Sequence, residues 1–277
     1  MPDPQMPSPA EPFDRDKSFI ETDDGVIAAE VIGDGAPVVM LHPLALAARA
    51  WGSMADRLAQ RFQVVTVDLR GHGESTWSGE PFSMTDLADD VTAVLDALEL
   101  ERAHLVGMSM GGSIAITFAG LQPHRVDHLL LADTTSWYGE DAVATWNERA
   151  EKALNVPREK QVPFQTERWF TEDFRETDPD EVRRVVDIFL ATDSRAHAAA
   201  SRAMGQMDSR ELLNAVIAPT LVLAGEEDYA TPPEMAQFIA EHVKDGRAVT
   251  LPGLRHLSLI QRPDLADVVA AHFEDQA

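Results

Sequence analysis

Mostly apolar runs of five to seven residues recur along the chain, separated by longer segments with apolar residues at helical spacing. The segment 247–251 is predicted as the last strand, and the apolar runs lie at residues 37–41, 64–68, 103–107, 126–132 and 219–225. Such runs predict strands buried on both faces, and the segments between them predict amphipathic helices. An antiparallel hairpin is predicted for Ser18–Ile32, with a turn at Asp23–Gly25. The alternation predicts an α/β fold, with a mostly parallel sheet covered by helices on both faces.

The pattern changes between residues 137 and 213, where strand-like runs are missing. This segment combines helical pieces, acidic stretches and several aromatic residues. Because it interrupts the alternation directly after a strand, we predict a helical lid over the strand ends; the alternative is an ordinary run of packing helices. The predicted division is a flexible tail rich in proline and acid at 1–16, a core at 17–136 and 214–277, and the lid at 137–213.

The chain is strongly acidic, with 47 Asp and Glu residues against 23 Lys and Arg and a net charge of -24. Only four of the basic residues are lysines. The resulting field repels nucleic acid and anionic lipid, so neither is an expected partner. An acidic substrate would need a local cationic contact.

The composition argues against disulfides, metal or cofactor sites, and a location in the membrane. The chain has no cysteine, so it forms neither disulfides nor cysteine-ligated metal sites. Metal motifs and phosphate-binding glycine loops are also missing, so no cofactor is expected. No run is long and apolar enough for a membrane span, and the first residues do not resemble a signal peptide, which predicts a cytoplasmic protein. The pattern does not decide between a monomer and a homo-oligomer.

The stretch from Arg102 to Gln122 predicts a strand, a very tight turn and a helix, and the turn reads Gly-x-Ser-x-Gly around Ser109. Such a turn holds the serine in strained backbone geometry at the end of the strand, with its hydroxyl in open space. Gly107 and Gly111 suit the turn because a side chain at either would clash between strand and helix. The helix N-terminus also favours negative charge. The motif predicts a catalytic nucleophile; the alternative is a serine that only caps the helix.

A serine hydroxyl needs a base within hydrogen-bond reach, and the base needs a partner that fixes its tautomer. In this architecture the chain order is serine, acid, histidine. Of the nine histidines, His256 lies in a loop after the last predicted strand and is the expected base. His72, in a glycine-punctuated loop, is a weaker candidate. The others lie in or beside predicted elements or in the lid.

The acid is expected to follow the preceding strand, as Glu226, Glu227 and Asp228 all do. We favour Asp228, because it comes just before the turn into a helix, where a short carboxylate can be held rigidly. Thr231 is predicted to cap that helix. The alternative for the three carboxylates is a solvated acidic loop.

The oxyanion of an acyl-transfer intermediate needs two N–H donors. Met110, directly after the nucleophile, offers one. The second is expected in the turn after the strand at 37–41, and Leu44 is preferred because Pro43 has no N–H. His42 in this turn is expected to shape it and not to act as a base.

Five motifs together resemble the α/β-hydrolase superfamily over about residues 18–275. They are the His-Pro pair at 42–43, DLRGHGES at 68–75, GMSMGG at 107–112, GEEDYATPP at 225–233 and LRHLS at 254–258. Within the superfamily the chain is similar to 3-oxoadipate enol-lactonases and related lactonases and esterases, most visibly in RWFTEDF at 168–174. The resemblance implies an eight-stranded sheet with a helical lid, and Ser109, Asp228 and His256 as nucleophile, acid and base.

The resemblance also implies a small-molecule ester or lactone as substrate. If this substrate is anionic, a lid arginine should pair with its carboxylate, and Arg168, Arg195 and Arg202 are the candidates. Trp137, Trp169 and Arg168 are the expected substrate contacts. Two rival functions remain: hydrolysis of a carbon–carbon bond with the same triad, and a small-molecule binding protein that keeps the fold but not catalysis.

Overall fold

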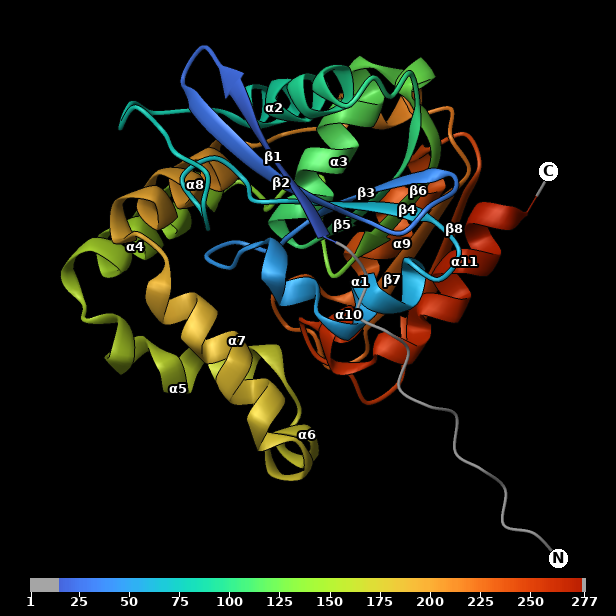
Figure 1. Ribbon diagram of the computed structural model, residues 1–277. Helices are drawn as coiled ribbons and strands as arrows, with labels where there is room; N and C mark the ends of the chain where they lie inside the picture. The colour runs from blue at the N-terminus through green and yellow to red at the C-terminus, as the bar shows by residue number, and fades with distance from the viewer. Residues whose placement is uncertain (1–14, 276–277) are drawn as a thin grey trace, which may run out of the picture.

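The computed structural model describes residues 15–275, in which eight strands form one sheet (Figure 1). The sheet order is β1-β2-β4-β3-β5-β6-β7-β8. The strands are β1 (Arg15–Thr22), β2 (Gly25–Ile32), β3 (Pro37–Leu41), β4 (Gln63–Val67), β5 (Ala103–Met108), β6 (Val126–Ala132), β7 (Thr220–Gly225) and β8 (Gly246–Leu251). β1 pairs antiparallel with β2 and β2 with β4, while β3 to β8 are parallel to one another. The predicted fold class is confirmed.

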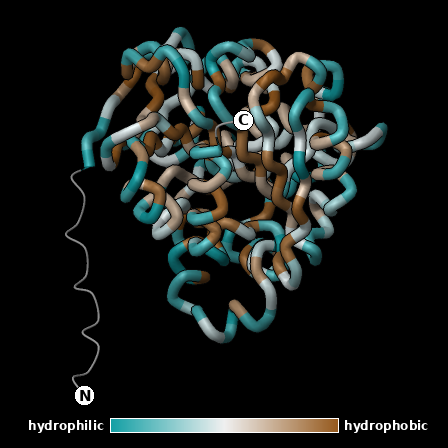
Figure 2. Tube along the Cα trace, turned by 90° about the vertical axis from the view of Figure 1, so that its right-hand side faces the viewer, coloured by the Kyte–Doolittle hydropathy of each residue, from teal (hydrophilic) through white to brown (hydrophobic). Residues whose placement is uncertain are grey.

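Helices cover both faces of the sheet, and this explains the continuous apolar runs. Alternate side chains of a strand point to opposite faces. Val39 and Leu41 of β3 therefore join the apolar cluster beneath α2 (Met84–Ala97), α3 (Met110–Leu121) and α9 (Pro233–His242). Val38 and Met40 join the cluster beneath α1 (Ser53–Leu58) and α11 (Ala266–Glu274). The hydrophobic stretches accordingly run through the interior of the molecule (Figure 2).

The helices of the core, including those just named, lie between or after the strands along the chain. They are η1 (Ala48–Trp51), α1 (Ser53–Leu58), α2 (Met84–Ala97), α3 (Met110–Leu121), η2 (Pro123–Arg125), η3 (Glu211–Ala215), α9 (Pro233–His242), α10 (Ser258–Gln261), η4 (Pro263–Leu265) and α11 (Ala266–Glu274). Within residues 15–275, no helix combines the length and the apolar character that a membrane crossing requires.

Local sequence signals explain several element ends, with two differences. The hairpin turns between β1 and β2 as predicted. The Ser83 hydroxyl and the Asp86 carboxylate form a capping box at the start of α2. The predicted tail lies outside the described residues except for Arg15 and Asp16, which belong to β1. Thr231 does not cap α9, because Pro232 occupies the N-cap position and the Thr231 hydroxyl binds another partner.

Five α-helices lie between β6 and β7 and project to one side of the sheet (Figure 1). They are α4 (Ala142–Asn155), α5 (Arg158–Trp169), α6 (Glu172–Thr177), α7 (Pro179–Ala191) and α8 (Ser194–Gln206). Polar contacts attach this helical segment to the core. Arg184 of α7 donates to the carbonyl oxygens of Arg49 (2.6 Å) and Ala50 (2.9 Å), and the Thr192 hydroxyl donates to that of Ala45 (2.8 Å).

Candidate active site

Ser109 lies between β5 and α3 in a backbone conformation that the surroundings enforce. Its φ of 55° and ψ of -119° are unusual for a residue with a side chain. A Cβ at Gly107 would overlap the backbone of Gly111, and one at Gly111 would overlap the carbonyl of Leu41. The Ser109 N–H donates to the Ala132 carbonyl (2.9 Å). Close packing of strand and helix thus requires both glycines, as the sequence predicted.

Three side chains from separate strand ends form a continuous relay. The Ser109 Oγ lies 2.9 Å from His256 Nε2, and His256 Nδ1 lies 2.7 Å from Asp228 Oδ2. The three residues are 4%, 2% and 2% exposed. The sequence-predicted nucleophile, base and acid are therefore brought into hydrogen-bond contact in a buried site.

The neighbouring carboxylates take no part in this relay. Glu226 accepts a hydrogen bond from the Gly253 N–H (3.1 Å), and Glu227 pairs with Arg255 (3.3 Å). Both glutamates are exposed. Both contacts are made within surface loops. Of the three candidate acids, Asp228 is therefore the one whose carboxylate reaches His256.

Backbone and hydroxyl donors hold the Asp228 carboxylate in place. Oδ1 accepts from the N–H groups of Ala230 (2.8 Å) and Thr231 (3.2 Å), while Oδ2 accepts from the Thr231 hydroxyl (2.7 Å) and faces His256. The Thr231 hydroxyl therefore serves the carboxylate and not the helix.

Burial and the surrounding charges set the protonation states of the relay. Burial lowers the pKa of His256, and the Arg168 cation lowers it further, although the Asp228 carboxylate acts in the opposite direction. Burial alone would raise the pKa of Asp228, but His256 and the hydrogen-bond donors outweigh it and lower this pKa to about 2. At neutral pH Asp228 is thus ionised and His256 neutral. Its Nδ1–H donates to Asp228, which leaves Nε2 free to accept the serine proton.

The two N–H groups predicted to bind an oxyanion are available near Ser109. Leu44 lines the same cavity as Ser109 and His256, and Met110 begins α3. Neither N–H donates a hydrogen bond to any residue within 15–275. A helix N-terminus adds its positive dipole end at Met110. Both donors can therefore accept a new partner without breaking an existing bond.

Two buried histidines support the turn that carries Leu44. His42 Nδ1 contacts the Pro43 carbonyl (2.7 Å), and His42 Nε2 accepts from the Leu69 N–H (3.0 Å). His72 Nε2 accepts from the Ala45 N–H (3.3 Å). Burial lowers the pKa of His42 to about 4 and that of His72 to about 3, so both are neutral at pH 7. They shape the turn, and His72 forms no hydrogen bond with Ser109.

A cavity of about 250 Å³ opens onto Ser109 and His256. The turn at residues 43–45 forms one side and the helical segment the other. Its lining comprises Pro43, Leu44, Ala45, Ser109, Trp146, Arg149, Lys152, Val156, Lys160, Gln161, Phe164, Gln165, Arg168, Trp169, His197 and His256. Trp169 and Arg168 lie where the sequence placed them. Trp137 does not line the cavity, because its ring packs under the Arg210 guanidinium at 3.7 Å.

Arg168 is the candidate arginine that faces the relay. It is 8% exposed, and its Nη2 lies 3.5 Å from His256 Nε2. Its Nε is buried with no hydrogen-bond partner among the described residues. Arg195 and Arg202 instead lie beside Asp193 and Glu151.

Arg149 is a second cavity arginine, which the sequence reasoning missed. Its guanidinium lies 4.5 Å from the ring centre of Trp146. Burial and the charge of Arg168 lower its pKa to about 10, so it remains a cation at neutral pH.

Asp133 connects the loops that carry the acid and the base, and it too was missed. This fully buried residue follows β6 with a φ of 49°. Its Oδ1 accepts from the Gly225 N–H (3.0 Å), while Oδ2 accepts from the N–H (2.9 Å) and hydroxyl (2.7 Å) of Ser258. Burial and the nearby Asp228 raise the pKa of Asp133. The contacts fix the loop ends after β7 and β8 relative to each other.

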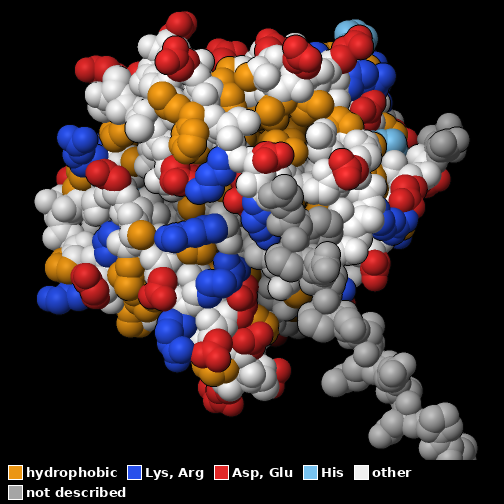
Figure 3. All heavy atoms as spheres, in the orientation of Figure 1, with side chains coloured by type: hydrophobic (Ala, Val, Ile, Leu, Met, Phe, Trp, Pro, Cys, Tyr) orange, Lys and Arg blue, Asp and Glu red, His pale blue; other side chains and the backbone are white. Residues whose placement is uncertain are grey.

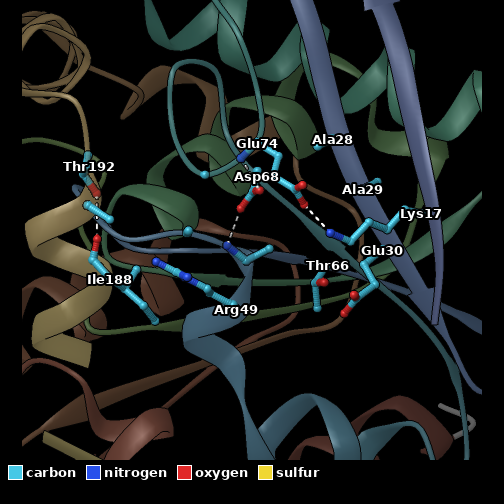
Figure 4. Close-up of a pocket in the computed structure, with 14 residues that line it drawn as sticks. Lys17, Ala28, Ala29, Glu30, Arg49, Thr66, Asp68, Glu74, Ile188 and Thr192 are labelled. Carbon is cyan, nitrogen blue, oxygen red and sulfur yellow. Dashed lines mark hydrogen bonds and ion pairs between the residues drawn. The ribbon is translucent and has the colours of Figure 1, made fainter. Parts of the chain in front are cut away.

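A larger pocket of about 450 Å³ lies elsewhere, with Arg49, Asp68 and Thr192 among its lining residues (Figure 4). Four of its five charged side chains have partners, and only Arg49 has none among the described residues. Lys17 pairs with Glu74, and the Asp68 carboxylate accepts from the N–H groups of Ala48 (2.7 Å) and Glu74 (2.8 Å). Ser109 and His256 do not line it. Its size alone therefore does not make it a catalytic site.

Comparison with known proteins agrees with the fold and the motifs. The profile of the alpha/beta hydrolase fold family matches residues 36–263. 3-Oxoadipate enol-lactonase 1 of Acinetobacter baylyi is 31% identical over 215 residues, which cover 77% of this chain and 79% of that protein.

Solved structures agree over almost the whole chain. The enol-lactonase of Burkholderia xenovorans superposes with a TM-score of 0.88 at 26% identity, covering 93% of this chain and 100% of that one. A hydrolase from Pseudomonas aeruginosa gives 0.87 at 30% identity, covering 93% and 98%. The protein is therefore an α/β-hydrolase and belongs to the alpha/beta hydrolase fold family.

Proposed function

We propose that this protein is a serine hydrolase that cleaves a carboxylic ester or lactone through an acyl-enzyme. The observation that carries the proposal is the buried relay from Ser109 through His256 to Asp228, whose two links measure 2.9 and 2.7 Å. The similarity to enol-lactonases supports the same reaction class.

In the first half-reaction, Ser109 Oγ attacks the carbonyl carbon while His256 Nε2 takes the hydroxyl proton. The carbonyl electron pair moves to oxygen, where the N–H groups of Leu44 and Met110 stabilise it. Asp228 stabilises the imidazolium. As the carbonyl re-forms, the bond to the leaving oxygen breaks, and His256 gives its proton to that oxygen. In a lactone this oxygen stays attached to the acyl chain.

In the second half-reaction, water attacks the acyl-enzyme. His256 takes the water proton, the oxyanion forms again in the same position, and Ser109 leaves with the proton from His256. The product is a free carboxylic acid. Each half-reaction returns the imidazole to its neutral state, so the cycle needs no cofactor.

The helical segment acts as a lid in this proposal. It supplies one side of the cavity through α4 and α5, while the core supplies the relay and the oxyanion donors. The Leu257 N–H, next to His256, also donates to the Trp169 carbonyl at the end of α5 (3.1 Å). The segment thereby excludes water and selects the substrate.

A carboxylate on the substrate is the partner that Arg168 lacks. A buried cation without a counter-charge is costly, and a bound carboxylate would compensate it. Because Arg168 touches the His256 side of the relay, the bound carboxylate lies only a few bonds from the scissile carbonyl. We therefore propose that the ester or lactone carries a free carboxylate on a short chain.

Arg168→Gln should reduce the preference for charged substrates. We expect the ratio of kcat/KM for a free-acid ester to that for its methyl-esterified analogue to fall at least about tenfold, because the charge-assisted contact is lost. The Arg168 cation lowers the His256 pKa, so its removal should raise that pKa and shift the acidic limb of the pH–rate profile to higher pH. An unchanged ratio together with an unchanged limb would exclude the carboxylate contact.

The proposal as a whole is tested by covalent labelling with a serine-directed fluorophosphonate. We expect one adduct per chain, which peptide mass spectrometry places on Ser109, because only an activated serine reacts quickly. The buried Ser113, whose hydroxyl donates to the Thr135 carbonyl, is the internal control. No adduct would favour the rival binding protein. A substrate panel with ring-fission diketones separates ester hydrolysis from carbon–carbon bond hydrolysis.

A further inference from the structure

The cavity has a charge opposite to that of the protein. The chain carries -24 and has only four lysines. Four cations nevertheless line the cavity, namely Arg149, Lys152, Lys160 and Arg168, and no Asp or Glu of the described residues does. The face in Figure 3 shows scattered acidic side chains and a group of basic ones near its middle. A lining with four cations and no carboxylate is opposite to the net charge of the whole chain.

None of the four cations has a carboxylate partner. Thirteen of the 23 Lys and Arg side chains form ion pairs with Asp or Glu, and these four are among the ten that form none within residues 15–275. Arg168 is buried, and Lys152 and Lys160 are exposed. Repulsion between these like charges disfavours the empty cavity, and a bound anion would relieve it.

Helix geometry divides the cations into two levels. Arg149 and Lys152 are three residues apart on α4, and Lys160 and Arg168 are eight apart on α5. Both spacings keep the side chains on one face of their helix. At 1.5 Å per residue, the eight-residue separation corresponds to roughly 12 Å along α5. Arg149 and Arg168 form the inner level, on the His256 side. Lys152 and Lys160 form the outer level, toward the exposed end of the cavity.

The space between the two levels is suited to a spacer. Phe164 lines the cavity midway between Lys160 and Arg168 on α5. It is an exposed apolar side chain, as is Val156, which lines the cavity just after the end of α4. Gln161 and Gln165 line the cavity as well. A ligand that reaches from one level to the other would therefore place an uncharged chain against these side chains.

We propose that Lys152 and Lys160 form a second anion subsite at the cavity mouth. The substrate is then an ester or lactone with two anionic groups: a carboxylate at Arg168 near the scissile carbonyl, and a second carboxylate at the far end of an uncharged spacer. This inference rests on the proposed function for the identity of the reacting bond. The subsite itself is a binding property that can be measured separately.

The experiment compares product-like acids as inhibitors. α,ω-Dicarboxylates of about four to twelve carbons are tested against hydrolysis of 4-nitrophenyl acetate, each beside the monocarboxylate of equal length. We expect one range of lengths in which the diacid inhibits about tenfold more strongly than the monoacid, because only the diacid reaches both levels. In Lys152→Gln/Lys160→Gln this ratio should fall to about twofold or less.

The matched control is Lys244→Gln/Arg247→Gln, which removes the same charge at exposed positions away from the cavity. It should retain the diacid ratio. No diacid advantage at any length, or an advantage equal in both double variants, would overturn the second subsite. If the wild-type protein hydrolyses no ester, this result would instead contradict the proposed function. Calorimetric titration of the same diacids into the protein tests the subsite in that case too.

Discussion

Ser109→Ala is expected to lower kcat for ester or lactone hydrolysis by roughly 10⁵-fold or more, because the acyl-enzyme can no longer form. The remaining rate should come from water attack on a carbonyl polarised by the N–H groups of Leu44 and Met110. Steady-state kinetics on an activated ester measures the loss. The fold should persist, because the hydroxyl removed bonds only to His256 among the described residues.

Ser113→Ala is the control for this variant. Ser113 is also a buried serine, one turn along α3, and its hydroxyl donates to the Thr135 carbonyl at 2.9 Å. Its loss should reduce thermal stability, since it leaves a buried acceptor unpaired, without abolishing turnover. Ester hydrolysis by Ser109→Ala at the wild-type rate, in protein free of other esterases, would end the serine mechanism.

The sequence was sufficient for the fold because each strand carries its own signal. The runs at β3, β5, β6 and β7 are largely apolar, and the structure buries these strands between helices on both faces. The relay residues were also predictable, because each follows a predicted strand in a short loop. In a parallel sheet these strand ends meet at one edge.

Residues in the helical segment were harder to predict, because helical spacing gives a side chain's face but not what it faces. Trp137 was expected at the substrate, but it packs against Arg210. Arg149 was overlooked, although it and Lys152 share one face of α4. Their presence among so few basic residues was a signal that pattern analysis could have used.

Thr231 shows a second limit of prediction from sequence. A threonine just before a helix can cap that helix, or it can donate to a neighbouring carboxylate instead. Its position before two prolines predicted a helix cap, yet its hydroxyl binds the Asp228 carboxylate. Asp133 shows the converse case: a carboxylate directly after an apolar strand, whose partners Gly225 and Ser258 lie far away along the chain. Long-range partners of this kind leave no trace in local periodicity.

Asp228→Asn is expected to lower kcat by about 10³- to 10⁴-fold at neutral pH through a change of histidine tautomer. Oδ1 accepts from two backbone N–H groups, those of Ala230 and Thr231, so the amide oxygen of the introduced asparagine should occupy this position. The amide NH₂ then faces His256 Nδ1, which must become the acceptor. The imidazole proton moves to Nε2, where it faces Ser109, and the base is lost.

The tautomer can be observed independently of the rate. In the wild-type protein, the His256 Nδ1 proton, held 2.7 Å from Asp228 in heavy-atom distance, should give a downfield NMR signal that disappears in Asp228→Asn. Glu227→Gln is the matched control, because it removes the adjacent carboxylate, which pairs with Arg255 at the surface, and it should change kcat by less than about twofold. Retention of both the signal and the rate in Asp228→Asn would show that another group orients His256. Asp133 could not take that role without breaking its bonds to Ser258, so the outcome would place the orienting acid outside the observed relay.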